Sequence, residues 1–217
     1  TNYISICYAK PLHAYDKDKI GDSLSLETLS SYGSFLALND EKYNLASGDL
    51  VVSSNGEIVG LAGIIGGKET GCTPTTKNII LESAYFDPVA ISRSGRKYDI
   101  ITDARQRFER GIDNNFVKTG LMIASKMIMD ICGGEFSLVS EYHQEAKPKN
   151  VNFKIKTIEE ISGIDIAAQD IERILMNLGL KVIDQQDDAL LLEVPSWRHD
   201  ITIEEDLVEE ILRIYGF

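Results

Sequence analysis

The stretch GLAGIIGGKETG (60–71), followed by NIILESAYF (78–86) and TDARQRFERG (102–111), decides how the rest of the chain is interpreted. The first part is rich in glycine, which lets backbone approach a ligand closely. The second is an apolar run interrupted by one carboxylate, Glu82, and the third is dense in arginine. Between Arg93 and Arg110 the chain has six cations against three anions, although its net charge is −12. This local surplus is typical of a phosphate-binding surface or of arginines paired with acids inside a fold, and both interpretations stay open.

The composition is that of an ordinary globular chain, with 43% hydrophobic and 26% charged residues. Its 217 residues suit one large or two small domains. No apolar run reaches transmembrane length and no signal peptide is recognisable, so we expect no membrane contact. The chain enters without Met on YISICYA (3–9), which is typical of a strand and of an excised piece of a longer protein. Three cysteines without metal-ligand spacing predict buried thiols in a reduced, cytosolic setting.

A domain boundary is predicted in the polar segment EYHQEAKPKN (141–150), which follows a helix stop at Gly133 and Gly134. We therefore divide the chain into a first domain, 1–146, and a second domain, 147–217. The second domain carries 8 cations and 15 anions, which makes it an improbable phosphate binder.

The first domain is predicted to mix strands and helices. Asn55-Gly56 between apolar runs indicates a β-hairpin, and residues 78–86 indicate a buried strand. A short helix is expected over about 88–96, with Pro88 near its start. A second helix follows Asp113 and presents one apolar face, predicted to be core, made of Val117, Leu121, Ala124, Ile128 and Ile131. The spacing of the glycines at 60–67 does not match a dinucleotide-binding fingerprint.

The second domain is predicted to hold short helices around a small hairpin. Thr157 and Glu160 indicate a capping box for a helix ending at Gly163. A helix over about 167–178, strands 181–184 and 189–194, and a final helix over about 203–215 follow. The apolar face of that last helix consists of Leu207, Val208, Ile211, Leu212 and Tyr215. The arrangement suggests a winged-helix-like module, and the fold class of the whole chain is α+β.

Three residues of the first domain are candidates for chemistry, each with a structural alternative. His13 is a possible catalyst or a satisfied structural residue. Glu82 is an acceptor for a substrate hydroxyl or ammonium, or a salt-bridge partner of the arginine cluster, because an unpaired carboxylate in an apolar strand is costly. Thr102 is a helix N-cap or a polar wall of a pocket.

Five motifs resemble one family in the same order along the chain. KPLHAYDKDKI (10–20), GLAGIIGG, NIILESAYFDP and TDARQRFERG resemble the B3/B4 domain of the bacterial phenylalanyl-tRNA synthetase β subunit. VPSWRHDITIEEDLVEEILRIYGF (194–217) resembles the end of its B5 domain. The resemblance implies an internal fragment of that subunit, with a partner α subunit in an α2β2 heterotetramer, tRNA(Phe) as RNA partner and a cytoplasmic location. The parent enzyme would be an ATP-dependent ligase, with ATP not bound by this fragment.

The resemblance also implies site residues. B3/B4 is the editing domain, which hydrolyses tyrosine wrongly joined to tRNA(Phe). His13 and Glu82 would be its catalytic residues, and Gly66, Thr102 and Ala104 would shape the pocket. Glu82 would accept the hydrogen bond of the tyrosine phenol, and His13 would lie by the scissile ester or hold the attacking water.

The rival interpretation is a non-catalytic structural and RNA-positioning module of the β subunit. Under either interpretation Arg93, Arg96 and Arg105 are the RNA-binding candidates. Arg105 stands where the family usually has Ser, which favours this rival, whereas His13 and Glu82 together favour the enzyme.

The last helix carries an acidic face made of Asp206, Glu209 and Glu210, which lie one turn apart. The pattern alone favours a solvated acidic face and leaves ligation of a hard cation as the alternative. The resemblance implies instead a Mg²⁺ site shared with the α subunit, with Asp200 as the fourth ligand; carboxylate oxygens suit this cation.

Overall fold

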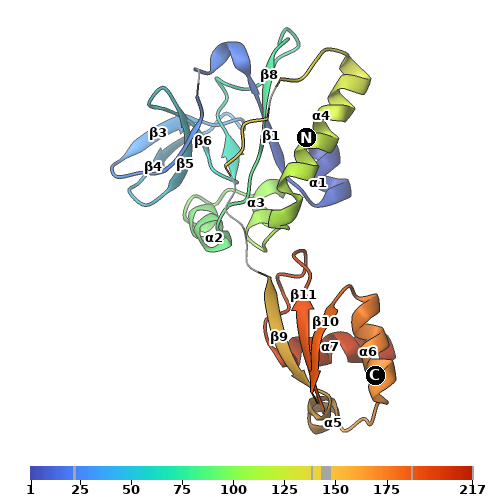
Figure 1. The fold of residues 1–217 in the computed structure, drawn as a ribbon. Coiled ribbons are helices and arrows are strands. Elements are labelled where there is room, and N and C mark those ends of the chain that lie inside the picture. Colours follow the sequence, from blue (N-terminus) through green and yellow to red (C-terminus); the bar gives the residue numbers. More distant parts are fainter. Residues whose placement is uncertain (22, 138, 143–147, 187, 217) are drawn as a thin grey trace. The chain divides into compact units, whose positions relative to one another are not determined.

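The structure is a computed structural model that describes residues 1–21, 23–137, 139–142, 148–186 and 188–216. It divides into two compact units, Thr1–Ser140 and Glu141–Phe217 (Figure 1). Each unit has its own buried apolar core. The α+β fold class is confirmed, because helices accompany antiparallel sheets in both units. The predicted boundary between residues 146 and 147 falls outside the described residues.

The core of the first unit lies on a four-stranded antiparallel sheet with the order β2-β5-β6-β7. Its strands are β2 (Ser25–Thr28), β5 (Leu50–Ser54), β6 (Glu57–Leu61) and β7 (Ile65–Gly66). The predicted hairpin is confirmed as β5–β6. Asn55 and Gly56 both take positive φ, 51° and 83°, as a tight primed turn requires.

Two further strand pairs complete the first unit. β1 (Leu12–Asp16) pairs with β8 (Ile79–Ser83), and β3 (Gly33–Leu36) pairs with β4 (Lys42–Leu45). The strand predicted over 78–86 is therefore shorter than expected. It is also only partly buried, and in the described part of the chain β1 is the one strand that pairs with it.

The helices of the first unit agree in part with those predicted from the sequence. These elements are α1 (Asn2–Tyr8), η1 (Lys17–Lys19), α2 (Pro88–Lys97), α3 (Asp103–Phe108), η2 (Asn114–Phe116) and α4 (Val117–Cys132). α2 is confirmed, and it begins with Pro88 in the first turn while the carboxylate of Asp87 accepts the N–H of Ala90 at 2.7 Å. α4 ends at Gly133 as predicted.

Three expectations for the first unit are wrong. Most of YISICYA lies in the helix α1, not in a strand; α1 contacts α4 and β1, with Ile4 buried and Ile6 exposed. The face of α4 is not a core face along its length, because Ala124 is buried but Ile131 is 77% exposed. Cys7, Cys72 and Cys132 are exposed rather than buried. An apolar pattern in the sequence does not by itself determine which face of a helix another element will cover.

The second unit packs helices against the three-stranded antiparallel sheet β10-β11-β9. Its elements are β9 (Lys149–Lys154), α5 (Lys156–Ser162), α6 (Ala168–Asn177), β10 (Lys181–Gln186), β11 (Ala189–Val194) and α7 (Glu204–Tyr215). The predicted helices and hairpin are confirmed, although β10 extends two residues beyond Asp184.

Two details of the second unit differ from expectation. Thr157 does not cap α5; its hydroxyl donates instead to the carboxylate of Glu204 at 3.2 Å. Tyr215 is half exposed, whereas Leu207, Val208, Ile211 and Leu212 of α7 are buried as predicted. In the described part of the chain, no helix is long and apolar enough to cross a membrane.

Candidate functional site

A cavity of about 80 Å³ opens in the first unit between the β1–β8 ribbon, the glycine-rich turn and α3. Four of the five residues predicted for the catalytic pair and pocket line it: His13, Gly66, Glu82 and Ala104. Phe86 and Phe108 supply apolar wall, with their rings edge-on and 5.0 Å apart between centroids. The chain thus brings together residues that are distant in sequence.

The register of the β1–β8 ribbon sets His13 against Glu82. The two residues are direct cross-strand partners, so their side chains leave the ribbon on the same face. Tyr15 lies two residues beyond His13 on β1 and therefore also shares that face. Its ring meets the imidazole edge-on, 4.4 Å between centroids.

His13 has an unsatisfied nitrogen. Among the described residues, its Nε2 is the buried side-chain nitrogen or oxygen that has no hydrogen-bond partner. Burial lowers the pKa of His13, which favours the neutral imidazole. Gly66 makes room for the ring, since a Cβ there would lie 2.3 Å from Cε1 of His13. An unpaired polar atom facing a cavity is available to a ligand or a water.

Glu82 is partly exposed as a residue, yet its carboxylate is enclosed by protein atoms, and the enclosure governs its charge. Burial raises the pKa of Glu82, while the hydroxyl of Tyr15 and the positive charge of Lys10 oppose that rise. The Tyr15 hydroxyl donates to Oε2 at 2.6 Å. In the part of the chain that the structure describes, Glu82 is hydrogen-bonded to Tyr15 and makes no ion pair with the arginine cluster.

Thr102 makes two hydrogen bonds that connect the elements around the cavity. Its Oγ1 accepts the N–H of Arg105 at 3.1 Å, which makes it the N-cap of α3 as one interpretation predicted. The same hydroxyl donates to the carbonyl of Ile64 at 2.8 Å. Thr102 thereby ties the glycine-rich turn to the start of α3, where Ala104 reaches the cavity.

The three arginines proposed to bind RNA have different surroundings. Arg93 and Arg96 are exposed on α2 and line an open hollow with Val89 and Glu109. Within the described residues neither guanidinium makes a hydrogen bond or ion pair. Arg105 instead points inward: its NH1 donates to the carbonyl of Ile100 at 2.6 Å and its Nε to Glu109 at 3.1 Å.

A glycine creates the space that Arg105 fills. A Cβ at Gly95 would lie 2.2 Å from Nε of Arg105. Arg105 therefore serves the packing of α2 on α3, and the phosphate-binding candidates that face solvent reduce to Arg93 and Arg96.

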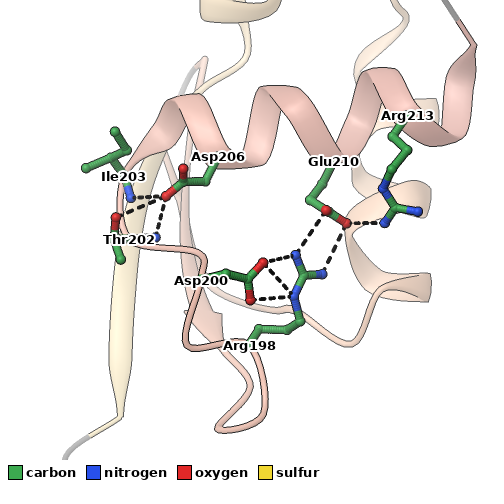
Figure 2. Close-up of polar contacts among 7 residues, drawn as sticks. All are labelled: Arg198, Asp200, Thr202, Ile203, Asp206, Glu210 and Arg213. Carbon is green, nitrogen blue, oxygen red and sulfur yellow. Dashed lines mark hydrogen bonds and ion pairs between the residues drawn. The ribbon is translucent and has the colours of Figure 1, made fainter. Parts of the chain in front are cut away.

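Three of the four carboxylates of the predicted Mg²⁺ site, those of Asp200, Asp206 and Glu210, are bound to groups of the chain itself (Figure 2). Arg198 lies between Asp200 and Glu210, with 2.6 Å from NH2 to Oδ2 of Asp200 and 3.0 Å from NH2 to Oε1 of Glu210. Arg213 pairs with Glu210 from the opposite side. The Arg198 guanidinium holds the pKa of Asp200 below its usual range.

Asp206 has a structural role at the start of α7. Its Oδ2 accepts the backbone N–H of Thr202 at 2.6 Å and of Ile203 at 3.0 Å, and these bonds lower its pKa (Figure 2). Glu209 is exposed. In the described residues, His, Cys, Asp and Glu side chains form no group of three or more that could hold a metal ion. These four residues do not fit a Mg²⁺ site within this chain by itself.

The sequence did not point to Tyr15, which lines the cavity, or to Lys10, whose charge acts on Glu82 from outside the cavity lining. The signal for Tyr15 lay in the motif HAYD (13–16), since residues two apart on a strand share a face. Nothing in the sequence indicated that Lys10 would be buried, because lysine side chains are almost never fully buried. Here it is 1% exposed and its Nζ donates to the carbonyl of Ala84.

Comparison with known proteins identifies two sequence families. Residues 1–133 match the B3/4 domain family, and residues 151–217 match the tRNA synthetase B5 domain family. The phenylalanine–tRNA ligase β subunits of Rickettsia felis and Rickettsia prowazekii are 40% and 41% identical over 100% of this chain. The chain spans 30% and 29% of the length of these relatives.

A third relative and one solved structure carry the same description. The phenylalanine–tRNA ligase β subunit of Paramagnetospirillum magneticum is 39% identical over 100% of this chain and 27% of its own length. An N-terminal fragment of the phenylalanyl-tRNA synthetase β subunit from Pyrococcus horikoshii superposes with a TM-score of 0.49 at 15% identity. The match covers 100% of this chain and 64% of that one.

Proposed function

Because the chain belongs to the B3/4 domain family and carries a B5 domain after it, we propose that its first unit hydrolyses tyrosine wrongly attached to tRNA(Phe). The observation that carries the proposal is the pairing of His13 and Glu82 across the β1–β8 ribbon, on the wall of one cavity. One of these side chains has a buried nitrogen that finds no partner among the described residues, and the other is a carboxylate in apolar surroundings.

The carboxylate suits discrimination between tyrosine and phenylalanine. The two amino acids differ by one hydroxyl, which an apolar pocket rejects or selects poorly. A site built to hydrogen-bond that hydroxyl discriminates by roughly 10⁴–10⁵ in the best cases. Glu82 would accept the phenol hydrogen, and Phe86 and Phe108 would flank the ring. The cavity is smaller than the apolar cavity of about 150 Å³ that takes up benzene, so ring entry requires its walls to adjust.

The histidine suits activation of water. A water oxygen would attack the ester carbonyl carbon while its proton passes to Nε2 of neutral His13. The bond between that carbon and the ribose oxygen would then break as the same proton moves to the ribose oxygen. The products are free tyrosine and tRNA with a free terminal hydroxyl. The lowered pKa of His13 favours the neutral form that this role needs.

Deacylation of Tyr-charged tRNA(Phe) by the chain tests the proposal. We expect Glu82→Gln to lose selective hydrolysis of the tyrosyl ester and His13→Ala to slow it by about 10²–10⁴. Phe-charged tRNA(Phe) is the substrate control. Equal hydrolysis by wild type and Glu82→Gln would overturn the assignment, provided that both are folded by circular dichroism.

The second candidate function is RNA positioning without catalysis. Arg93 and Arg96 favour it, because both are exposed on one helix beside a hollow. It predicts that the chain binds tRNA(Phe) but leaves the tyrosyl ester intact.

The match to the B5 domain family supports a further proposal about the role of this chain. We infer a role in an ATP-dependent phenylalanine–tRNA ligase, with aminoacylation in a partner α subunit, an α2β2 assembly and a cytoplasmic location. Any Mg²⁺ site at Asp200, Asp206, Glu209 and Glu210 would need oxygens from that partner, since Mg²⁺ demands near-octahedral ligation. Calorimetric titration of Mg²⁺ into the chain and then into the α–β complex tests this. Tight binding to the chain alone would contradict it.

A further inference from the structure

Two side chains outside the predicted site act on Glu82, one through a hydrogen bond and the other through its charge. Tyr15 belongs to β1, and Lys10 lies just before that strand. Both are almost completely buried, with 2% and 1% of their surface exposed. Neither belongs to the catalytic pair proposed above, and burying a lysine and a tyrosine beside a carboxylate is costly unless each has a partner.

Tyr15 orients one oxygen of the carboxylate. Its hydroxyl donates to Oε2 of Glu82 at 2.6 Å, and its ring is braced edge-on by His13. Burial and the neighbouring carboxylate raise the pKa of Tyr15, so the hydroxyl remains a donor across the physiological range. A carboxylate has two oxygens with about four acceptor positions. Oε1 has no hydrogen bond within the described residues and can accept one from a ligand.

Lys10 supplies positive charge behind the carboxylate. Its Nζ donates to the carbonyl of Ala84, two residues beyond Glu82 on the chain, and lies 6.0 Å from the ring centroid of Phe108. Burial lowers the pKa of Lys10 to about 8, while Asp113 and Glu82 raise it. The ammonium is therefore still largely charged near neutral pH.

The surrounding helix is shaped to admit this lysine. A Cβ at Gly120 of α4 would lie 2.9 Å from Cγ of Lys10, so glycine leaves room for its stem. The groups that face Glu82 are thus Tyr15 and His13 from β1 and Lys10 before it, with Asp113 acting on Lys10.

We propose that Tyr15 and Lys10 are positioning residues that present Oε1 of Glu82 as a fixed acceptor for the hydroxyl of a phenolic ligand in the cavity. The inference rests on the proposed function, which supplies tyrosine as that ligand. The Tyr15 hydroxyl fixes the rotation of the carboxylate, and Lys10 opposes the tendency of burial to protonate it. Specificity for a hydroxyl would then depend on two residues that do not touch the ester.

The first test measures the carboxylate without any ligand. Carbon-13 NMR of labelled glutamate side chains gives the pKa of Glu82, assigned by its loss in Glu82→Gln. Tyr15→Phe removes one hydroxyl and keeps the ring, and Lys10→Met removes the charge and keeps the stem. We expect the pKa of Glu82 to rise in both variants. Tyr43→Phe is the matched control, because that hydroxyl also donates to a carboxylate, Glu41, outside the cavity.

The second test measures recognition with 4-methylphenol and toluene as probes. We expect wild type and Tyr43→Phe to prefer 4-methylphenol, and Tyr15→Phe to reduce that preference about tenfold, the order of one charge-assisted hydrogen bond. An unchanged pKa of Glu82 in both Tyr15→Phe and Lys10→Met would overturn the inference. So would a stronger preference for 4-methylphenol in Tyr15→Phe, which would mean that Tyr15 competes with the ligand.

The two proposals fail separately. A wild-type chain that prefers 4-methylphenol but leaves Tyr-charged tRNA(Phe) intact would reject editing and keep the positioning role. A chain that hydrolyses the tyrosyl ester equally well with Tyr15→Phe, and shows no change in the pKa of Glu82, would keep editing and reject the positioning role. If Lys10→Met fails to fold, Tyr15→Phe alone decides.

Discussion

At the scale of single residues, the charge of Glu82 makes stability depend on pH. Burial raises its pKa in the folded chain above the ordinary value of 4.5. The folded state therefore holds this proton more tightly than the unfolded state does. The contribution of Glu82 to stability is fully present below about pH 4.5 and is lost as pH rises through the folded pKa.

Glu82→Gln tests this sign. The variant cannot ionise at residue 82, so we expect its free energy of unfolding, relative to wild type, to increase with pH above 4.5. The slope should not exceed about 1.4 kcal/mol per pH unit. Urea unfolding followed by circular dichroism at several pH values measures it. A difference that shrinks as pH rises would mean that the carboxylate is stabilised by its partners more than it is penalised by burial.

A second residue-scale effect concerns Arg198. Its side chain is 17% exposed and that of Glu210 12% exposed, so this ion pair is partly shielded from water. We expect Arg198→Met to destabilise the second unit by about 1–3 kcal/mol, because Asp200 and Glu210 lose charge-assisted hydrogen bonds. Urea unfolding followed by Trp197 fluorescence measures this. Arg173→Met is the control: its pair with Asp170 is exposed and should contribute less than about 1 kcal/mol. Equal effects would make the Arg198 pairs ordinary surface interactions.

At the scale of elements, helix α2 has one face that packs in the core and another that carries exposed arginines. Ile91 and Ser94 are buried, whereas Arg93 and Arg96 face solvent. The same helix can therefore lose its arginines without losing its packing.

We expect Arg93→Gln with Arg96→Gln to weaken tRNA(Phe) binding and to flatten its salt dependence. The log–log slope should fall by about 0.7–0.9 for each phosphate that an arginine no longer neutralises. Filter binding across a range of salt concentrations measures the slope. Lys42→Gln with Lys77→Gln removes the same charge from exposed positions elsewhere in the unit. An equal effect of both pairs would reduce the role of α2 to bulk charge.

At the scale of the whole molecule, two separate apolar cores predict two separable unfolding events. Ile91 and Ile171 are each 1% exposed, one in each core. We expect Ile91→Ala and Ile171→Ala to destabilise their own unit by about 2–5 kcal/mol. Because Trp197 is the single tryptophan and lies in the second unit, its fluorescence should move with Ile171→Ala and not with Ile91→Ala. A shift in both variants would show that the units unfold together.

The sequence determined the elements whose ends are set by local backbone chemistry. Asn55-Gly56 fixed the β5–β6 hairpin, Pro88 the start of α2, and Gly163 the end of α5. These positions act through their own φ preferences, so no distant partner is needed. His13, Gly66, Glu82 and Ala104, which line the cavity, were also singled out from the sequence, through motifs that resemble a family.

Only the tertiary structure decided which side chains meet. Tyr15 and Glu82 are 67 residues apart in sequence. A hydrogen bond between such distant residues produces no periodic pattern in the sequence, so the sequence did not predict it. The same holds for Arg105, whose space exists because Gly95 lies on a neighbouring helix. YISICYA became α1 because packing on α4 outweighed a strand-like pattern. Whether a side chain is buried or paired depends on the whole chain, because its partner lies on a different element of the fold.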